Sequence, residues 1–106
     1  MLKKKQRLTK REFDQYFTSG KRFHTPLFQL IYVPENTFHG AAVVGKKVYK
    51  KAAHRNKLRR RLYAALYTLS REAAITGVYI VIAKPAAKES AYSELKESLS
   101  KVIKTM

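Results

Sequence analysis

The chain has 106 residues, 45% of them hydrophobic, and its 23 Lys and Arg against seven Asp and Glu give a formal net charge of +16. These values predict one domain over residues 1–106 with its own core, and they favour a polyanionic partner, nucleic acid ahead of an anionic membrane. The absence of cysteine excludes disulfides and thiolate sites, and with no secretory signal or membrane-length apolar run we expect a cytoplasmic protein without a membrane partner.

The N-terminal segment predicts a basic lead-in followed by a helix. Residues 1–8 carry four Lys or Arg and no acid, and we expect them to be flexible. Thr9 and Glu12 have the spacing of a capping box, so a helix should begin there. It should run to about Ser19, where Gly20 is suited to end it.

Three aromatic residues of this helix, Phe13, Tyr16 and Phe17, share one face. Their spacing alone favours packing in the core, which is the commoner role of such a face. It also leaves open a partly exposed platform on which bases could stack.

The next part of the chain predicts strands. We expect a short strand at Lys21 to His24 and a firmer one at Leu27 to Val33, which is rich in aromatic and β-branched residues. Residues Ala41 to Val48 are predicted as the return strand of a hairpin.

The second half of the chain predicts two helices around a strand. A long helix is expected from about Lys51 to Ala73, and an apolar run at Val78 to Ala83 is typical of a central strand. A last helix should run from an N-cap at Ser90 to about Lys104. The order α-β-β-β-α-β-α predicts a single-domain α/β sandwich of the α+β class, with four strands and three helices.

The strongest functional signal is the run from Lys46 to Arg61. It holds nine Lys or Arg among sixteen residues and no acid. Burial of so many unpaired charges would be too costly, so this surface must face water or an anion. On the helix, Asn56, Arg60 and Tyr63 share one face, while a separate apolar stripe is formed by Leu58, Leu62, Ala65, Leu66 and Leu69. We interpret the helix as packing on a sheet with this stripe and holding arginines outward, although most charge runs are only solvated faces.

Motifs for catalysis are scarce. His24, His39 and His54 match no metal-site spacing, the seven acids are scattered, and no glycine-rich phosphate loop is present. The residues therefore indicate a binding protein that assists nucleic-acid chemistry without performing it. RNA with unpaired segments fits better than a DNA groove, because strands rather than a helix-turn-helix precede the basic helix.

Taken together, these residues make the chain similar to the protein subunit of bacterial ribonuclease P, which removes the 5′ leader from precursor tRNA. The resemblance covers nearly all of residues 5–104 and is most specific in Gly45 to Val48 (GKKV) and Arg55 to Arg60 (RNKLRR). Arg7-Leu8 and the pair Phe13 and Phe17 support it. It implies a four-stranded sheet, three helices and an unusual left-handed β-α-β crossover.

The resemblance also implies roles. The catalyst would be a large RNA with bound Mg²⁺, and the protein would bind this RNA and precursor tRNA without an obligate protein partner. Residues implied to contact the catalytic RNA are Lys46, Lys47, Arg55, Asn56, Lys57, Arg59 and Arg60. Residues implied to line a leader cleft between sheet and helix are Lys10, Phe13, Phe17 and Tyr32. We expect no residue of the protein to be catalytic or to bind a metal.

Several positions depart from the family pattern. Gly45 stands where Ser is usual, Tyr49 where Gly is usual, and Tyr63 where a later arginine falls, and the segment between Lys47 and Arg55 is one residue longer. Ile31 stands where an aromatic residue faces the cleft, and strand alternation points the adjacent Tyr32 to the other face.

Two alternatives stay open at this point. A ribosome-associated or general RNA-binding protein would share the charge and the fold, so composition does not separate it from the first hypothesis. A protein-only nuclease that uses the histidines is the other alternative.

Overall fold

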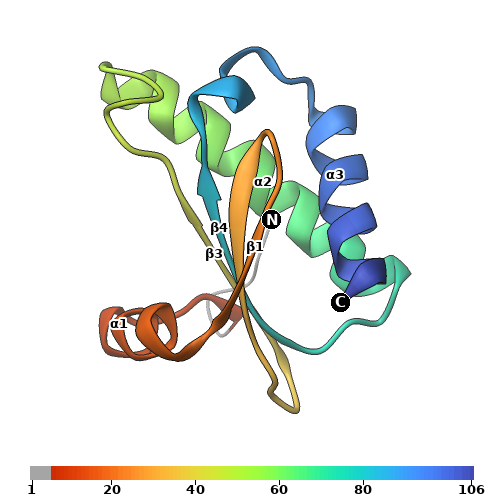
Figure 1. The fold of residues 1–106 in the computed structure, drawn as a ribbon. Helices are drawn as coiled ribbons and strands as arrows, with labels where there is room; N and C mark the ends of the chain where they lie inside the picture. The colour runs from red at the N-terminus through yellow and green to blue at the C-terminus, as the bar shows by residue number, and fades with distance from the viewer. Residues whose placement is uncertain (1–5) are drawn as a thin grey trace.

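A computed structural model describes residues 6–106 and places a four-stranded sheet between helices (Figure 1). The helices are α1 (Lys10–Ser19), α2 (Ala52–Glu72) and α3 (Tyr92–Thr105). The strands are β1 (Lys21–His24), β2 (Phe28–Val33), β3 (Phe38–Val43) and β4 (Gly77–Ala83). This confirms the predicted element order, to which the structure adds a short 3-10 helix, η2 (Pro85–Glu89). Of the predicted flexible lead-in, residues 1–5 lie outside the described residues.

The sheet order is β1-β2-β4-β3, and it corrects one predicted pairing. β1 and β2 form an antiparallel hairpin, whereas β3 pairs in parallel with β4. The predicted hairpin return strand over Ala41 to Val48 is therefore wrong in its partner and in its bounds. β4 is apolar and buried along almost its whole length, so it takes the central position between β2 and β3.

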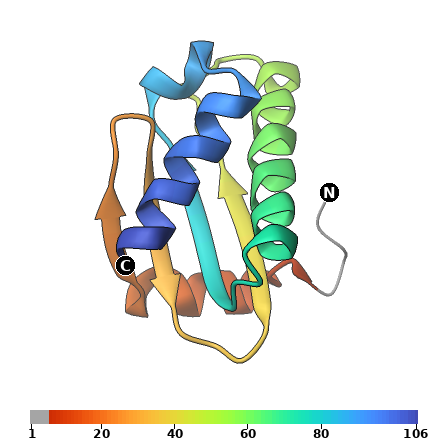
Figure 2. The same cartoon turned by 90° about the vertical axis from the view of Figure 1, so that its right-hand side faces the viewer.

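The connection from β3 through α2 to β4 has the rarer hand. With α2 toward the viewer, β4 lies to the left of β3 and both strands run upward (Figure 2). This geometry is a left-handed crossover, against the strong general preference for right-handed ones. The structure thus agrees with the hand that the family resemblance implies.

Local sequence explains how the helices begin and end. The predicted capping box is present: the Thr9 side chain accepts from the Glu12 N–H at 3.2 Å, and the Glu12 carboxylate accepts from the Thr9 N–H at 2.9 Å. Gly20 ends α1 in an extended conformation that any residue can adopt. Space rather than backbone conformation favours glycine there, because a Cβ would lie 2.2 Å from Cγ2 of Ile31. Ser90 is not the N-cap of α3, since it ends η2 and Ala91 occupies the cap position.

One face of the sheet is covered by α2 and α3. All five residues of the predicted apolar stripe of α2 are buried, and Leu95 and Leu99 of α3 are fully buried beside them. Burial of each such leucine stabilises the fold by about 1.5–3 kcal/mol. This packing holds α2 in place and leaves the polar flanks of its first turns free for a partner.

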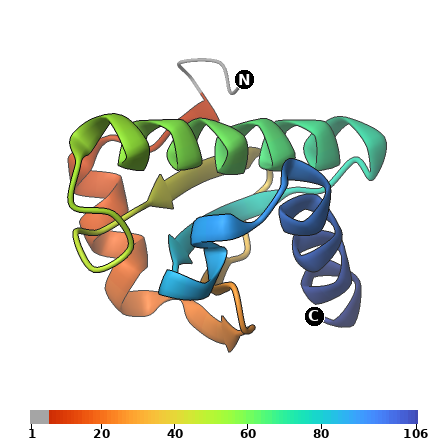
Figure 3. The same ribbon diagram turned by 90° about the horizontal axis from the view of Figure 1, so that it is seen from above.

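The opposite face is only partly covered. α1 lies across the strands at one end of the sheet (Figure 2), where its aromatic residues pack on Ile31, Ala41, Val78 and Ile80. No residue of α1 is fully buried. Viewed from above, α2 runs past the β3 edge, so that its N-terminal turns reach the side on which α1 lies (Figure 3). The basic turns and the aromatic helix therefore border the same side of the molecule.

Candidate nucleic-acid interface

The outer flank of α2 carries a surface that we call the arginine face. Its members line a hollow of about 300 Å³ and are Arg7, Asn56, Arg59, Arg60 and Tyr63. The predicted sharing of one face by Asn56, Arg60 and Tyr63 is thus confirmed. Asn56 and Arg60 are both exposed, and among residues 6–106 no hydrogen-bond or ion-pair partner holds Arg60.

Two contacts order the arginine face. The Arg59 guanidinium donates to Oδ1 of Asn56, which leaves the Asn56 amide N–H groups directed away from this bond. Arg7 is held beside the helix by a parallel β-bridge to Gly40, and its guanidinium carbon lies 5.8 Å from the ring centre of Tyr63. The face therefore gathers donors from α2 and from the segment before α1.

Arg55 has a different environment from the other predicted RNA-binding residues. Its guanidinium donates to the backbone carbonyl of Tyr49 at 3.0 Å and to that of Lys50 at 2.6 Å. The N-cap residue Lys51 makes no capping hydrogen bond with its side chain. Arg55 therefore holds the loop that precedes α2 in place.

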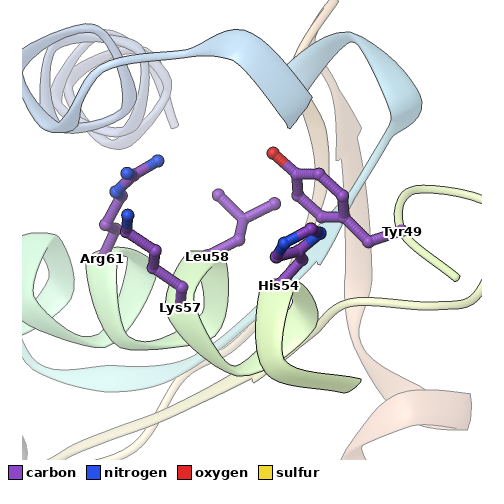
Figure 4. A pocket seen from close by; sticks show the side chains of 5 residues that line it. All are labelled: Tyr49, His54, Lys57, Leu58 and Arg61. Atoms are coloured by element: carbon purple, nitrogen blue, oxygen red, sulfur yellow. The ribbon is translucent and has the colours of Figure 1, made fainter. Parts of the chain in front are cut away.

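The remaining predicted residues lie on the other flank of α2, around what we call the loop pocket. This pocket has a volume of about 210 Å³. It is lined by Tyr49, His54, Lys57, Leu58 and Arg61 (Figure 4). An adjoining hollow is lined by Tyr49 and His54 together with Lys46, Lys47, Val48, Lys50, Lys51 and Lys88. Lys57 therefore lines the loop pocket, Lys46 and Lys47 line the adjoining hollow, and Asn56 and Arg60 line the separate hollow of the arginine face.

The predicted aromatic pair lies on the α1 side of the sheet. The rings of Phe13 and Phe17 stack with centres 5.6 Å apart, and both side chains are half-buried. The guanidinium carbon of Arg22 lies 4.8 Å from the centre of the Phe17 ring, and Arg22 donates to the Phe17 carbonyl at 2.9 Å. Lys10 is exposed at the start of the same helix. These side chains supply stacking surface and positive charge together.

Beside this pair, a row of half-buried side chains crosses the sheet, and we call it the open strip. Gln29, Ile82 and Val43 are register partners on β2, β4 and β3, and all three remain partly exposed. Ile82 and Val43 pack against the same cluster as Phe13 and Phe17, so the strip and the aromatic pair share one face. The open strip is therefore a candidate floor for an extended strand.

Tyr32 does not lie on the α1 side of the sheet, so its predicted place in the leader cleft is wrong. It packs against the core beneath α2 and α3, where its ring centre lies 5.2 Å from that of Tyr79. Ile31, its neighbour, is fully buried on the α1 side. The pleat of β2 sends successive side chains to opposite faces, so only one of the two can face the cleft.

Sequence reasoning missed the open strip, the loop pocket and the contribution of Arg7. The strip depends on strand register, and the pocket depends on Tyr49 meeting η2, a contact 39 residues apart along the chain. Neither leaves a local pattern. Arg7 carried one usable signal, its place in the family resemblance, but no spacing rule linked it to Tyr63.

The described residues offer neither a metal centre nor a membrane span. Within 6–106, no three His, Asp or Glu side chains gather as metal ligands. His24, His39 and His54 stand on β1, β3 and α2, and the latter two line separate pockets. No helix in this part of the chain is long and apolar enough to cross a bilayer.

Comparisons with known proteins identify the family. The Ribonuclease P family model matches residues 2–106. The ribonuclease P protein component of Nitratiruptor sp. is 34% identical over 95 residues, 90% of this chain and 85% of that protein. That of Shouchella clausii is 31% identical over 107 residues, 97% and 87% of the two chains.

Solved structures show the same fold at lower identity. The RNase P protein of Staphylococcus aureus gives a TM-score of 0.79 at 22% identity, over 94% of each chain. That of Thermotoga maritima gives 0.78 at 23% identity, over 94% of this chain and 96% of that one. The chain therefore belongs to the family of ribonuclease P protein components.

Proposed function

We propose that this protein binds the catalytic RNA of ribonuclease P with the first turns of α2 and the 5′ leader of precursor tRNA with the α1 side of the sheet, and so assists leader removal. The observation that carries the proposal is the lack of compensation for its positive charge. Within residues 6–106, the two ion pairs are Lys96 with Glu72 at the end of α2 and Lys101 with Glu97 within α3. The cations of α2's first turns are left for an outside anion.

The arginine face suits a folded RNA. Arginine guanidinium groups bind phosphate in a bidentate manner, and the Asn56 amide can bond to a base edge or a ribose. These groups are set on a long helix whose apolar stripe is fully packed, so their spacing is rigid. A rigid array of donors favours a partner of defined shape over a flexible one.

The α1 side suits an extended single strand. The open strip gives an apolar floor of Ile82 and Val43, with the Phe13 and Phe17 rings beside it. Stacking of a base on an aromatic side chain contributes about 1–3 kcal/mol and tolerates any base. This tolerance fits a leader, whose sequence differs from one precursor to another.

In this proposal the chemistry belongs to the RNA with its Mg²⁺, as the family resemblance implies. The protein's residues bind and position two polyanions whose phosphates repel each other. Cations placed between them reduce that repulsion, and dissolved Mg²⁺ can do the same. The gain from the protein should therefore be largest when Mg²⁺ is scarce.

The test is to add the protein to the catalytic RNA of the same organism and to measure precursor tRNA cleavage at low Mg²⁺. We expect a higher rate and tighter substrate binding, and a smaller gain with a double Asn56→Ala, Arg60→Ala variant. No gain at any Mg²⁺ concentration would contradict the proposal. Sequencing the RNA that copurifies from cells separates the alternative, since ribosomal RNA in place of a ribozyme would favour a ribosome-associated protein.

A further inference from the structure

We propose that the loop pocket binds one unpaired nucleotide of RNA, at a site separate from the arginine face. The inference rests on the proposed function only in taking RNA as the ligand. The pocket is lined by the loop before α2 and by the first turns of α2, and Lys88 of η2 lines the adjoining hollow. Figure 4 shows Tyr49 and His54 on one side of Leu58, and Lys57 and Arg61 on the other.

The pocket is held in shape by contacts of Tyr49. Its hydroxyl donates to the backbone carbonyl of Lys88 at 2.5 Å, and the Lys88 ammonium lies 5.3 Å from the centre of its ring. The His54 ring packs edge-on against the Tyr49 ring, with ring centres 5.3 Å apart and ring planes at 66°. The Arg55 guanidinium donates a hydrogen bond to the backbone carbonyl of Tyr49 and so fixes the backbone at this residue. A site formed before its ligand arrives avoids the entropic cost of ordering on binding.

The lining offers the two kinds of contact that a nucleotide needs. Leu58 is 1% exposed and gives an apolar floor, while the ring of His54 is exposed at the mouth. Histidine rings are among the platforms on which unpaired bases stack. Lys57 and Arg61, one turn apart on α2, can bind the phosphate on the opposite side.

The remaining lining argues against a simpler ligand. No Asp or Glu lines the loop pocket or the adjoining hollow, so every charged group there attracts an anion. A free anion would use the cations and leave the exposed His54 ring and the Leu58 floor without a role. A volume of about 210 Å³, open to solvent, is small for a ligand site and suits a single nucleotide.

The two surfaces of α2 should engage different RNA segments. Lys57 directly follows Asn56 of the arginine face, and Arg61 directly follows Arg60. Successive residues of a helix point about 100° apart, so the two surfaces face different directions. A strand that occupied both surfaces would have to cross the ridge of the helix between them. Loss of either surface should therefore weaken binding while the other surface still holds its own RNA segment.

The test is an NMR titration of the protein alone, read at its three histidine rings. Single-stranded octaadenylate is the first probe and inorganic phosphate the second, at constant pH. Octaadenylate should move the His54 ring protons upfield through the ring current of a stacked base, and His39 on β3 should stay unchanged. Arg61→Ala should weaken this binding about fivefold or more, whereas Arg71→Ala, which removes the same charge from the other end of α2, should change it less than about twofold.

Three results would overturn the inference. They are an unmoved His54 signal while octaadenylate saturates the protein, an equal His54 shift with phosphate alone, and an equal loss of affinity in the Arg61→Ala and Arg71→Ala variants. A His39 signal at the same chemical shift as in the unsubstituted protein reports that each variant is folded, and Lys57→Ala serves as a second variant. Activation of cleavage with an unmoved His54 would overturn the pocket alone. A His54 shift without activation would overturn the proposed function and leave the pocket.

Discussion

The guanidinium of Arg7 lies over the ring of Tyr63, with 5.8 Å between the guanidinium carbon and the ring centre. Tyr63 stands where the family resemblance implies an arginine on this helix. The segment before α1 supplies a cation to the same place, because Arg7 is bridged to Gly40 of β3. The departure at Tyr63 therefore does not leave the arginine face short of positive charge.

Arg7→Ala should weaken binding to the catalytic RNA even though Arg7 lies outside the basic helix. Loss of one phosphate contact should lower the slope of log affinity against log salt by about 0.7–0.9. The measurement is filter binding over a series of KCl concentrations. Lys101→Ala is the control, because Lys101 pairs with Glu97 on α3. A slope that is unchanged in Arg7→Ala would remove Arg7 from the interface.

Gly20→Ala should destabilise the protein by about 1–3 kcal/mol, as overpacking does in a filled core. The new methyl group would lie 2.2 Å from Cγ2 of Ile31 and 3.0 Å from the Tyr16 carbonyl oxygen. Gly45→Ala is the matched control, since a Cβ there meets no atom within 4 Å, and its effect should stay below about 0.5 kcal/mol. The measurement is the free energy of unfolding of both variants in urea. Equal values for Gly20→Ala and Gly45→Ala would show that α1 can move away from β2.

Alkaline pH should destabilise the protein through Tyr79. Burial, with a smaller effect of nearby Tyr32, raises the pKa of Tyr79 from 10.0 to about 12. From pH 10 upward the unfolded chain loses this proton while the folded protein keeps it until about pH 12, so stability falls across that window and is unaffected below it. Tyr79→Phe keeps the ring and loses the hydrogen bond to the Thr76 carbonyl. The urea midpoint of this variant should fall less between pH 10 and pH 11 than that of the unsubstituted protein. An equal fall in both would refute the assignment of the alkaline destabilisation to Tyr79.

Local patterns predicted those parts of the fold that local contacts determine. The capping box of Thr9 and Glu12 involves residues three apart, and the apolar stripe of α2 repeats at helical spacing. Both are read correctly from the chain. The bounds of α2 agree within one residue of the prediction for the same reason.

Pairing between distant segments could not be predicted in this way. Nothing in Phe38–Val43 shows that its partner is β4, because the register with Gly77 to Ile82 joins strands that the whole of α2 separates in the chain. The same limit applies to the candidate site. Tyr32 and Ile31 are adjacent, and the face that each takes depends on which side of β2 receives α1.

The most direct test of the central claim compares the affinity of Arg60→Ala and Phe13→Ala for two ligands, the catalytic RNA and, in the holoenzyme, a leader-bearing precursor tRNA. Arg71→Ala serves as the charge control on α2. Arg60→Ala should weaken binding to the catalytic RNA more than Phe13→Ala does, and Phe13→Ala should chiefly weaken binding of the precursor. Equal effects of both changes on both affinities would contradict a helix face for the ribozyme and an aromatic cleft for the leader.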